Sequence, residues 1–343
     1  MKSDYTLEGV GQRFNVTRRM SRTAVALVAG AAVLLSGCAF LQLPGKVAEW
    51  QQLMSPEEVI PAEPLSFDAA DGFLMDATID GHPVRLRVSL RSKGIELNPE
   101  TARRIGLESR GRSTAMQLGK KMVDGGYAQA EVLIGTARSY PRVEWFDADV
   151  GDGVDGVINI AYLPAPSVTL NLRPRREADR PTILPTVDRG GFAVVYRHRE
   201  GNRTIDVRPD LASSQTVLTT ATGAYLAERL GGTWSGTDRP HPIVYGIARP
   251  VRPMAFATPL IIGNFRIDEA LVRLRDYQGD DLLPSFDTGE DDEDTIMVVG
   301  DEDRTAAVHF LYLGRDVLGR CASITYTRAS QELELICPPP PDR

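Results

Sequence analysis

Long apolar runs are scarce in this chain of 343 residues. The most prominent one, Thr23–Leu35, has 13 residues, whereas a helix that spans a membrane needs about 20. A multi-span membrane protein is therefore excluded. Basic residues are outnumbered as well, because 39 Lys and Arg stand against 46 Asp and Glu, a formal net charge of −7. This balance argues against a nucleic-acid partner, whose phosphates require a basic surface.

Histidine is also rare. The four histidines are widely spaced in the sequence, at His82, His198, His241 and His309. No two of them have the i, i+2 or i+4 spacing that would suggest paired zinc ligands. Neither a metal site nor any other cofactor is therefore expected.

The remaining composition is that of an ordinary globular protein, with 42% apolar and 25% charged residues. Glycine (31) and proline (23) are frequent beside short Val, Ile and Leu runs, which is typical of short strands and turns. From Val84 to Leu90 apolar and polar residues alternate, which predicts a strand with one buried face. Short helices are predicted over 99–105 and 222–230. We therefore predict an all-β protein with short helices.

The N-terminal region is typical of an export signal. Several arginines precede the apolar run, which ends in Leu35-Ser36-Gly37-Cys38. This ending resembles the lipobox of bacterial lipoproteins, which implies cleavage before Cys38 and attachment of lipid to that residue. We expect a signal peptide over 1–37 and a tether over 38–64. A plain signal peptide, or a buried helix with an incidental cysteine, is the alternative.

The residue that follows the lipobox cysteine bears on location. By analogy with Gram-negative sorting rules, Ala39 in place of aspartate favours the outer membrane, with the protein lipid-anchored and facing the periplasm. Either Met1 or Met20 is the start of translation.

Two further cysteines agree with export. Cys321 and Cys337 belong to two predicted strands that turn near Ala329, and folding about this residue places the cysteines opposite each other. A disulfide is stable in an oxidising compartment. We predict this disulfide, with two free thiols as the alternative.

Two domains are predicted after the tether, as the length suggests. A charged stretch with proline near both ends is interpreted as a linker between them, and a polar tail ends the chain. The boundaries are 65–172 for the first domain, 173–190 for the linker, 191–337 for the second domain and 338–343 for the tail.

Both predicted domains contain similar landmarks in the same order, which is a sign of internal repetition. Ser89 aligns with Asp210 at an offset of 121 residues. An Ile-Gly pair follows in each domain, beginning at Ile134 and at Ile262. The shared order predicts an internal duplication.

These landmarks resemble those of the retropepsin-like aspartic peptidases. In that family each lobe has an Asp-Thr-Gly-Ala/Ser motif, a short helix, a flap hairpin and a closing Ile-Leu-Gly-x-Asp-x-Leu segment. The equivalent stretches here are Asp210-Leu211-Ala212-Ser213-Ser214 and Leu313–Leu318 in the second domain, and Ser89-Leu90-Arg91-Ser92 in the first. Asn159 stands where the first closing segment usually has glycine. The resemblance implies two retropepsin-like β-barrel lobes.

The family's mechanism uses one carboxylate from each lobe, about 3 Å apart and sharing one proton. The resemblance leaves Asp210 as the catalytic candidate and Ser89 as its degenerate partner, because a hydroxyl without a partner base is not a base near neutral pH. Whether the protein is an enzyme therefore stays open.

Three interpretations follow. The first is a pseudo-peptidase that binds a peptide or protein ligand with lost or weak proteolysis. The second is an active aspartic endopeptidase that uses Asp210, for instance with two Asp210 side chains meeting in a homodimer. The third is a structural or interaction lipoprotein of the envelope.

The resemblance also implies substrate-binding candidates, namely Arg91, Ala212, Ser213, Trp234 and Tyr245. Arg91 replaces the motif glycine, so it either pairs with Asp210 or faces solvent. Trp234 and Tyr245 accompany a predicted flap over 236–247, where they either line a peptide groove or belong to the core.

Two other motifs complete the set. Gly125-Gly126 predicts the tip of a flap hairpin in the first lobe. Asp287-Thr288-Gly289 is a literal copy of the family motif, but five consecutive acidic residues follow it and would not be buried. We interpret that stretch as a solvated loop.

Overall fold

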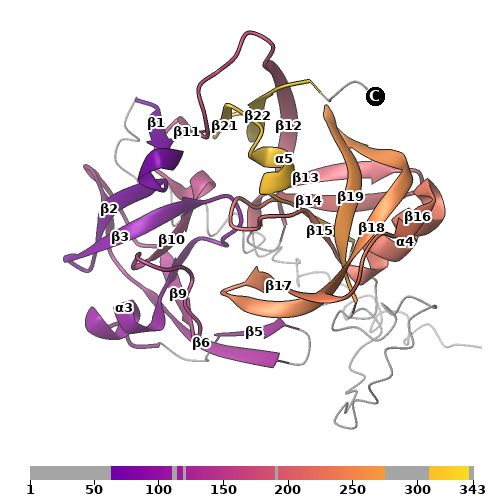
Figure 1. Cartoon of the computed structure of the whole chain (residues 1–343). Coiled ribbons are helices and arrows are strands. Elements are labelled where there is room, and N and C mark those ends of the chain that lie inside the picture. The colour runs from indigo at the N-terminus through magenta and orange to yellow at the C-terminus, as the bar shows by residue number, and fades with distance from the viewer. Residues whose placement is uncertain (1–62, 110–113, 119–120, 190–191, 275–308, 340–343) are drawn as a thin grey trace, which may run out of the picture. The chain divides into compact units, whose positions relative to one another are not determined.

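The computed structural model describes residues 63–109, 114–118, 121–189, 192–274 and 309–339 (Figure 1). The elements of the first half are β1 (Leu65–Asp68), η1 (Ala69–Asp71), β2 (Leu74–Ile79), β3 (His82–Ser89), β4 (Ile95–Leu97), α3 (Pro99–Arg104), β5 (Thr114–Leu118), β6 (Lys121–Gln129), β7 (Val132–Ile134), β8 (Ala137–Ser139), β9 (Arg142–Phe146), β10 (Gly156–Asn159), η2 (Ile160–Tyr162) and β11 (Ser167–Asn171). Those of the second half are β12 (Arg180–Arg189), β13 (Phe192–Glu200), β14 (Arg203–Pro209), β15 (Val217–Leu218), α4 (Thr220–Leu230), β16 (Gly232–Trp234), β17 (Arg239–Val244), β18 (Ile247–Ile262), β19 (Phe265–Arg273), β20 (Phe310–Leu313), α5 (Arg315–Leu318), β21 (Ser323–Thr327) and β22 (Glu332–Cys337). The described chain is thus mostly β with short helices, as predicted.

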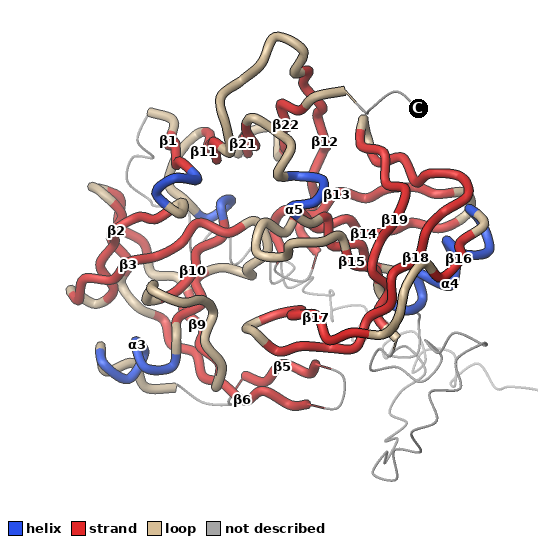
Figure 2. The backbone as a smooth tube through the Cα atoms, in the orientation of Figure 1, coloured by secondary structure: helices blue, strands red, loops and turns tan. Residues whose placement is uncertain are grey.

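The two halves have the same strand partners. In the first half, β10 runs parallel to β3 and antiparallel to β4, and β4 runs parallel to β9. In the second half, β20 runs parallel to β14 and antiparallel to β15, and β15 runs parallel to β19. Figure 2 shows that strands predominate over helices in both halves. The antiparallel pair β2–β3 matches β13–β14. The long antiparallel hairpin β18–β19 of the second half corresponds to two antiparallel pairs of the first half. These are β6–β9 and β7–β8.

Local sequence patterns explain the central elements. In β3 the side chains of Val84, Leu86 and Val88 are buried while their neighbours are less so, because successive strand residues point to opposite faces. Both predicted helices are present within a residue or two, α3 after β4 and α4 after β15. Helix α4 ends at Gly231, whose φ of 68° is the left-handed conformation that glycine adopts without strain.

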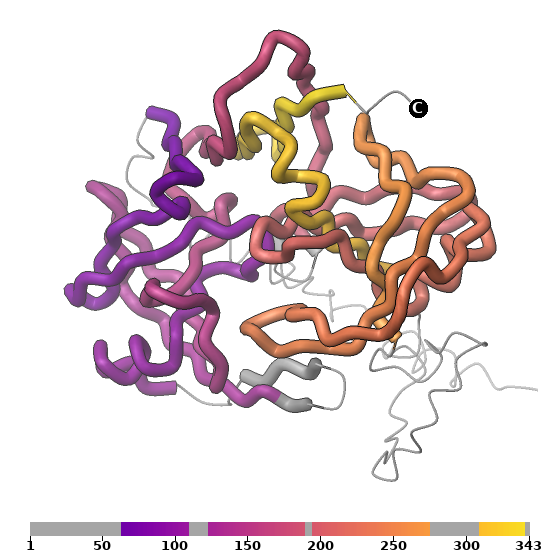
Figure 3. The backbone as a smooth tube through the Cα atoms, viewed as in Figure 1, coloured from indigo at the N-terminus to yellow at the C-terminus, as the bar shows by residue number. Residues whose placement is uncertain are grey.

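One sheet contains strands from both halves. Its order is β1-β11-β21-β22-β12-β13-β14-β20-β15-β19-β18-β16, so the first-half strand β11 pairs directly with the C-terminal strand β21. Figure 3 shows these C-terminal strands in yellow. A single hydrophobic cluster also contains buried residues of both halves. The main hydrophobic core therefore extends across both halves of the described residues.

The predicted linker is a strand over most of its length. Within 173–190, strand β12 pairs with β22 through six residues and with β13 at its end. Its inward residues are Thr182, Leu184 and Thr186, whereas Ile183 and Val187 between and beyond them are 56% and 38% exposed, so no alternation of buried apolar and exposed polar residues marks this strand in the sequence. Non-local pairing, not local composition, orders this part of the segment.

Gly125 and Gly126 do not form a hairpin tip. Both lie inside β6, paired with Phe146 and Trp145 of β9. A Cβ at Gly126 would lie 2.3 Å from the Trp145 ring, so the glycine accommodates the indole. Strand β6 does pair antiparallel with β5, from Thr114 opposite Gly125 to Leu118 opposite Lys121.

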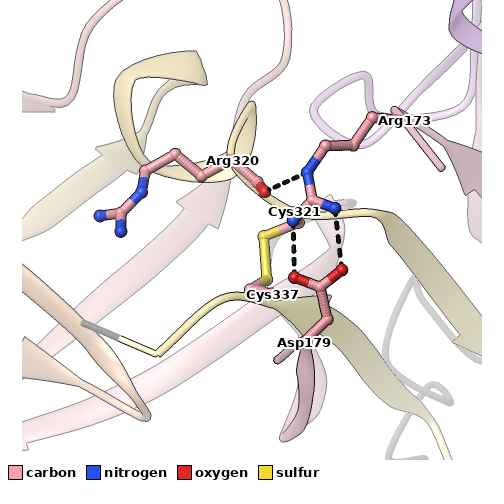
Figure 4. Close-up of a disulfide and its surroundings, with 5 residues drawn as sticks. All are labelled: Arg173, Asp179, Arg320, Cys321 and Cys337. Carbon is pink, nitrogen blue, oxygen red and sulfur yellow. Dashed lines mark hydrogen bonds and ion pairs between the residues drawn. A yellow bond between two sulfur atoms is a disulfide. The ribbon is translucent and has the colours of Figure 1, made fainter. Parts of the chain in front are cut away.

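The predicted disulfide between Cys321 and Cys337 is present (Figure 4). Strands β21 and β22 pair Ser323 with Ile336 and Thr327 with Glu332, so the hairpin is centred between positions 329 and 330. Beside the disulfide, the guanidinium of Arg173 donates to both carboxylate oxygens of Asp179, at 2.7 and 2.8 Å.

Several predictions fall outside the described residues. These are the signal peptide, Cys38 with its lipid, nearly all of the tether, the Asp287-Thr288-Gly289 motif and the last residues of the tail. Within the described ranges, every helix is too short or too polar to cross a membrane.

Candidate functional site

Ser89 and Asp210 occupy equivalent turns. Ser89 ends β3, and its Oγ accepts the backbone N–H groups of Arg91 and Ser92, both at 3.1 Å. Asp210 directly follows β14, and its Oδ1 accepts the N–H groups of Ala212 at 3.0 Å and Ser213 at 3.2 Å. Each side chain therefore accepts from the residues two and three positions ahead. We call residues 89–92 and 210–213 the motif loops.

The two motif loops meet through an ion pair. Nη1 of Arg91 lies 2.6 Å from Oδ2 of Asp210. Asp210 is 1% exposed and the Arg91 side chain 17%. Of the two alternatives for Arg91, the structure shows the pairing with Asp210. The same Nη1 donates to the carbonyl of Ile243, and the guanidinium lies 4.6 Å from the centroid of the Tyr312 ring.

The electrostatics keep this arginine charged. Burial by itself lowers the pKa of Arg91. The nearby Asp210 carboxylate and Tyr312 raise it by more than burial lowers it, so the pKa of Arg91 lies above its ordinary value. A second cation, Arg208, stacks 3.9 Å from the centroid of the Phe310 ring, and burial lowers its pKa. The carboxylate of Asp210 thus faces a guanidinium and not a second carboxyl group.

This arrangement cannot perform the acid–base exchange of a carboxyl dyad. A dyad needs one proton shared between two carboxyl groups. Here the position opposite Asp210 is filled by Arg91, which does not release its proton near neutral pH. The hydroxyl of Ser89 accepts two backbone hydrogen bonds instead of facing a base.

The pair Ser213 and His241 is not an activated nucleophile either. The Ser213 hydroxyl donates to the carbonyl of Gln215 at 2.6 Å, so its proton is already engaged. Nε2 of His241, 3.1 Å away, therefore acts as the donor to Ser213. Burial and the charge of Arg239 lower the pKa of His241, which keeps the ring neutral.

A hairpin of the second half lies over the motif loops. Strands β17 and β18 pair and turn at Tyr245 and Gly246, whose φ angles of 50° and 66° fit a two-residue hairpin turn. The Tyr245 ring stacks on Phe146 at a centroid distance of 5.4 Å. Its hydroxyl donates to Oε2 of Glu96 at 2.9 Å. The predicted second flap is present, and its tip contacts the first half.

Glu96 is a buried acid that the sequence did not indicate as part of the site. Only 5% of it is exposed, and its Oε1 accepts the backbone N–H of Lys93 at 2.9 Å. Burial raises its pKa, and the carboxylate of Glu144 adds to the rise against these hydrogen bonds. An isolated glutamate on a three-residue strand carries no sequence signal of this role.

The remaining candidate, Trp234, lies elsewhere. It ends β16, packs against the main core and has the guanidinium of Arg252 5.3 Å from its ring centroid. Four of the predicted binding residues lie in the motif loops or in the hairpin over them, namely Arg91, Ala212, Ser213 and Tyr245. Trp234 instead packs against the core, which was the alternative for this residue.

Comparisons with known proteins add little to this geometry. No protein-family model matches the chain, and no curated protein matches it. Among solved structures, it is similar to the EIAV protease complexed with the inhibitor HBY-793, at 13% identity and a TM-score of 0.20. That alignment covers 25% of this chain and 79% of the protease. A TM-score this low carries no argument, so the proposals below depend on strand pairing and site geometry.

Proposed function

We propose that this protein is a peptide-binding pseudo-peptidase with a duplicated retropepsin-like fold. The observation that carries the proposal is the ion pair between Arg91 and Asp210. It joins the loops that hold the catalytic acids in the resembling family, and it replaces the second acid by a fixed cation.

The proposed duplication is supported by the shared strand pairing of the two halves. The overall similarity to a solved structure does not contribute to it. Four central strands in each half have the same parallel and antiparallel partners, as β10 and β20 illustrate. Ser89 and Asp210 then end equivalent strands and make the same turn. Two unrelated lobes would have no reason to share both features.

The loss of activity follows from the chemistry of the pair. Removing one general acid or base typically costs a factor of about 10²–10⁴ in rate. The active homodimer is disfavoured because Asp210 is 1% exposed and already paired within its own chain. Two copies of this side chain would have to leave their partners before they could meet.

We further propose that the protein is a lipoprotein anchored through Cys38 in the outer membrane and facing the periplasm. The disulfide supports this location, since such bonds persist in oxidising compartments. Cells fed a labelled fatty acid should incorporate the label into the wild-type protein and not into Cys38→Ala. Equal labelling of the two proteins, or none in the wild type, would contradict lipid anchoring through Cys38.

The central experiment uses fluorescein-labelled β-casein, an unfolded protein that offers many extended segments. Binding is followed by anisotropy, and cleavage by gel electrophoresis between about pH 3 and about pH 7, the range of carboxyl chemistry. We expect binding without cleavage by the wild-type protein. Cleavage that disappears in Asp210→Asn would instead establish the endopeptidase. Absence of binding would favour the structural or interaction protein of the envelope.

A further inference from the structure

Strand β17 and the turn that follows it contact both motif loops and the facing half. His241 contacts Ser213 in the second loop, and the backbone carbonyl of Ile243 accepts from Arg91 in the first. Tyr245, in the turn, reaches Glu96. The side chains of His241 and Ile243 are buried and alternate with the exposed Pro240 and Pro242, so β17 buries one face.

This strand leaves no room for a peptide above Asp210. The nitrogen Nη1 of Arg91 binds Oδ2 of Asp210 at 2.6 Å and also the carbonyl of Ile243. The backbone of β17 is therefore separated from the Asp210 carboxylate by a single nitrogen atom. An extended ligand could reach this carboxylate only after β17 had moved away.

The hairpin is held in place by a small number of contacts. Ile243, two residues before the turn, and Val251, which pairs with Arg239 at the root, pack with Leu271 and Tyr312 in a small cluster separate from the main core. At the tip, Tyr245 contacts Glu96 and Phe146 of the first half. Because the cluster is small, the tip contacts contribute to holding the hairpin against the motif loops.

We infer that the β17–β18 hairpin is a built-in cover that occupies the ligand position at the motif loops and is latched by Tyr245 on Glu96. Release of the latch lets the tip lift together with Ile243, while the root stays paired at Arg239 and Val251. The role of the cover in admitting a peptide depends on the proposed function. The latch itself does not.

The test compares two tyrosine variants by hydrogen exchange with mass spectrometry on the full-length protein. Tyr245→Phe keeps the aromatic ring over Phe146 and removes the hydroxyl that Glu96 accepts. Tyr140→Phe is the matched control, because its hydroxyl also donates to a glutamate, Glu131 at 2.7 Å, but at an exposed site. Hydrogen bonds to buried charged groups are stronger than those at the surface.

We expect the amides of residues 239–250 to exchange about tenfold faster in Tyr245→Phe, as the loss of one charge-assisted hydrogen bond predicts. Exchange in the other strands should stay unchanged, and Tyr140→Phe should behave as the wild type throughout. Equal exchange of residues 239–250 in both variants would overturn the latch.

A binding arm with fluorescein-labelled β-casein separates the two proposals. Association should be faster with Tyr245→Phe than with the wild type or Tyr140→Phe. Faster hairpin exchange without any β-casein binding would support the latch and refute the proposed function. Equal β-casein association by all three proteins, with residues 239–250 still protected in the complex, would refute the cover and leave the proposed function intact.

Discussion

The buried ion pair predicts that Asp210→Asn changes stability in opposite directions in two backgrounds. It should destabilise the wild type and stabilise the Arg91→Met variant. In Arg91→Met the Asp210 carboxylate keeps its charge, 1% exposed, but loses its cation. At 2.6 Å and an effective dielectric constant of about 20, the lost attraction is about 6 kcal/mol before desolvation is subtracted. Removing one partner of such a pair costs about 3–5 kcal/mol of folding free energy.

Adding Asp210→Asn to Arg91→Met should then restore stability. The asparagine oxygen can still accept the N–H groups of Ala212 and Ser213, and no unpaired charge remains. We expect the double variant to regain about 2 kcal/mol over Arg91→Met, whereas Asp210→Asn alone should destabilise the wild type.

Urea unfolding monitored by circular dichroism measures these free energies. The control is Arg138→Met, since Arg138 pairs with Glu131 at 3.3 Å but its side chain is 60% exposed. Such a surface pair contributes at most about 1 kcal/mol. Equal losses in Arg91→Met and Arg138→Met, or a double variant less stable than Arg91→Met, would refute the buried pair.

Three further predictions concern stability. Burial raises the pKa of Glu96, so the folded state favours its protonated form and wild-type stability falls as pH rises through that pKa. Glu96→Gln should therefore gain stability relative to the wild type as the pH rises above 4.5, the ordinary carboxyl pKa. Cys321→Ala, which breaks a disulfide of sequence separation 16, should lose about 3 kcal/mol under oxidising conditions. Gly126→Ala should lose about 1–3 kcal/mol, because its Cβ would overlap an indole ring.

Each of these has a matched comparison. The Glu96→Gln prediction is measured by thermal unfolding of variant and wild type at several pH values. A difference in stability between the two proteins that did not change with pH would contradict it. For the disulfide, reductant should abolish the difference between wild type and variant. For the glycine, Gly94→Ala is the control, since its Cβ would meet its nearest neighbour at 4.0 Å. Equal losses at Gly94 and Gly126 would argue against the overlap.

Local patterns in the sequence determined much of the fold. Alternation from Val84 to Leu90 predicted β3, and the spacing of Cys321 and Cys337 predicted the hairpin and its disulfide. Ser89 and Asp210, which the sequence aligned, make the same local turn in the structure. Such features depend on neighbours in the chain, which is why a single sequence shows them.

Only the tertiary structure decided how distant segments combine. The charges around β12 hid a strand whose partners come from β22 and β13. Arg91 pairs with Asp210, 119 residues away in the sequence, instead of facing solvent. Tyr245 binds Glu96, 149 residues away. Burial in the folded state sets the strength of these contacts, since a charge removed from water must be paired, and no local pattern encodes the partner.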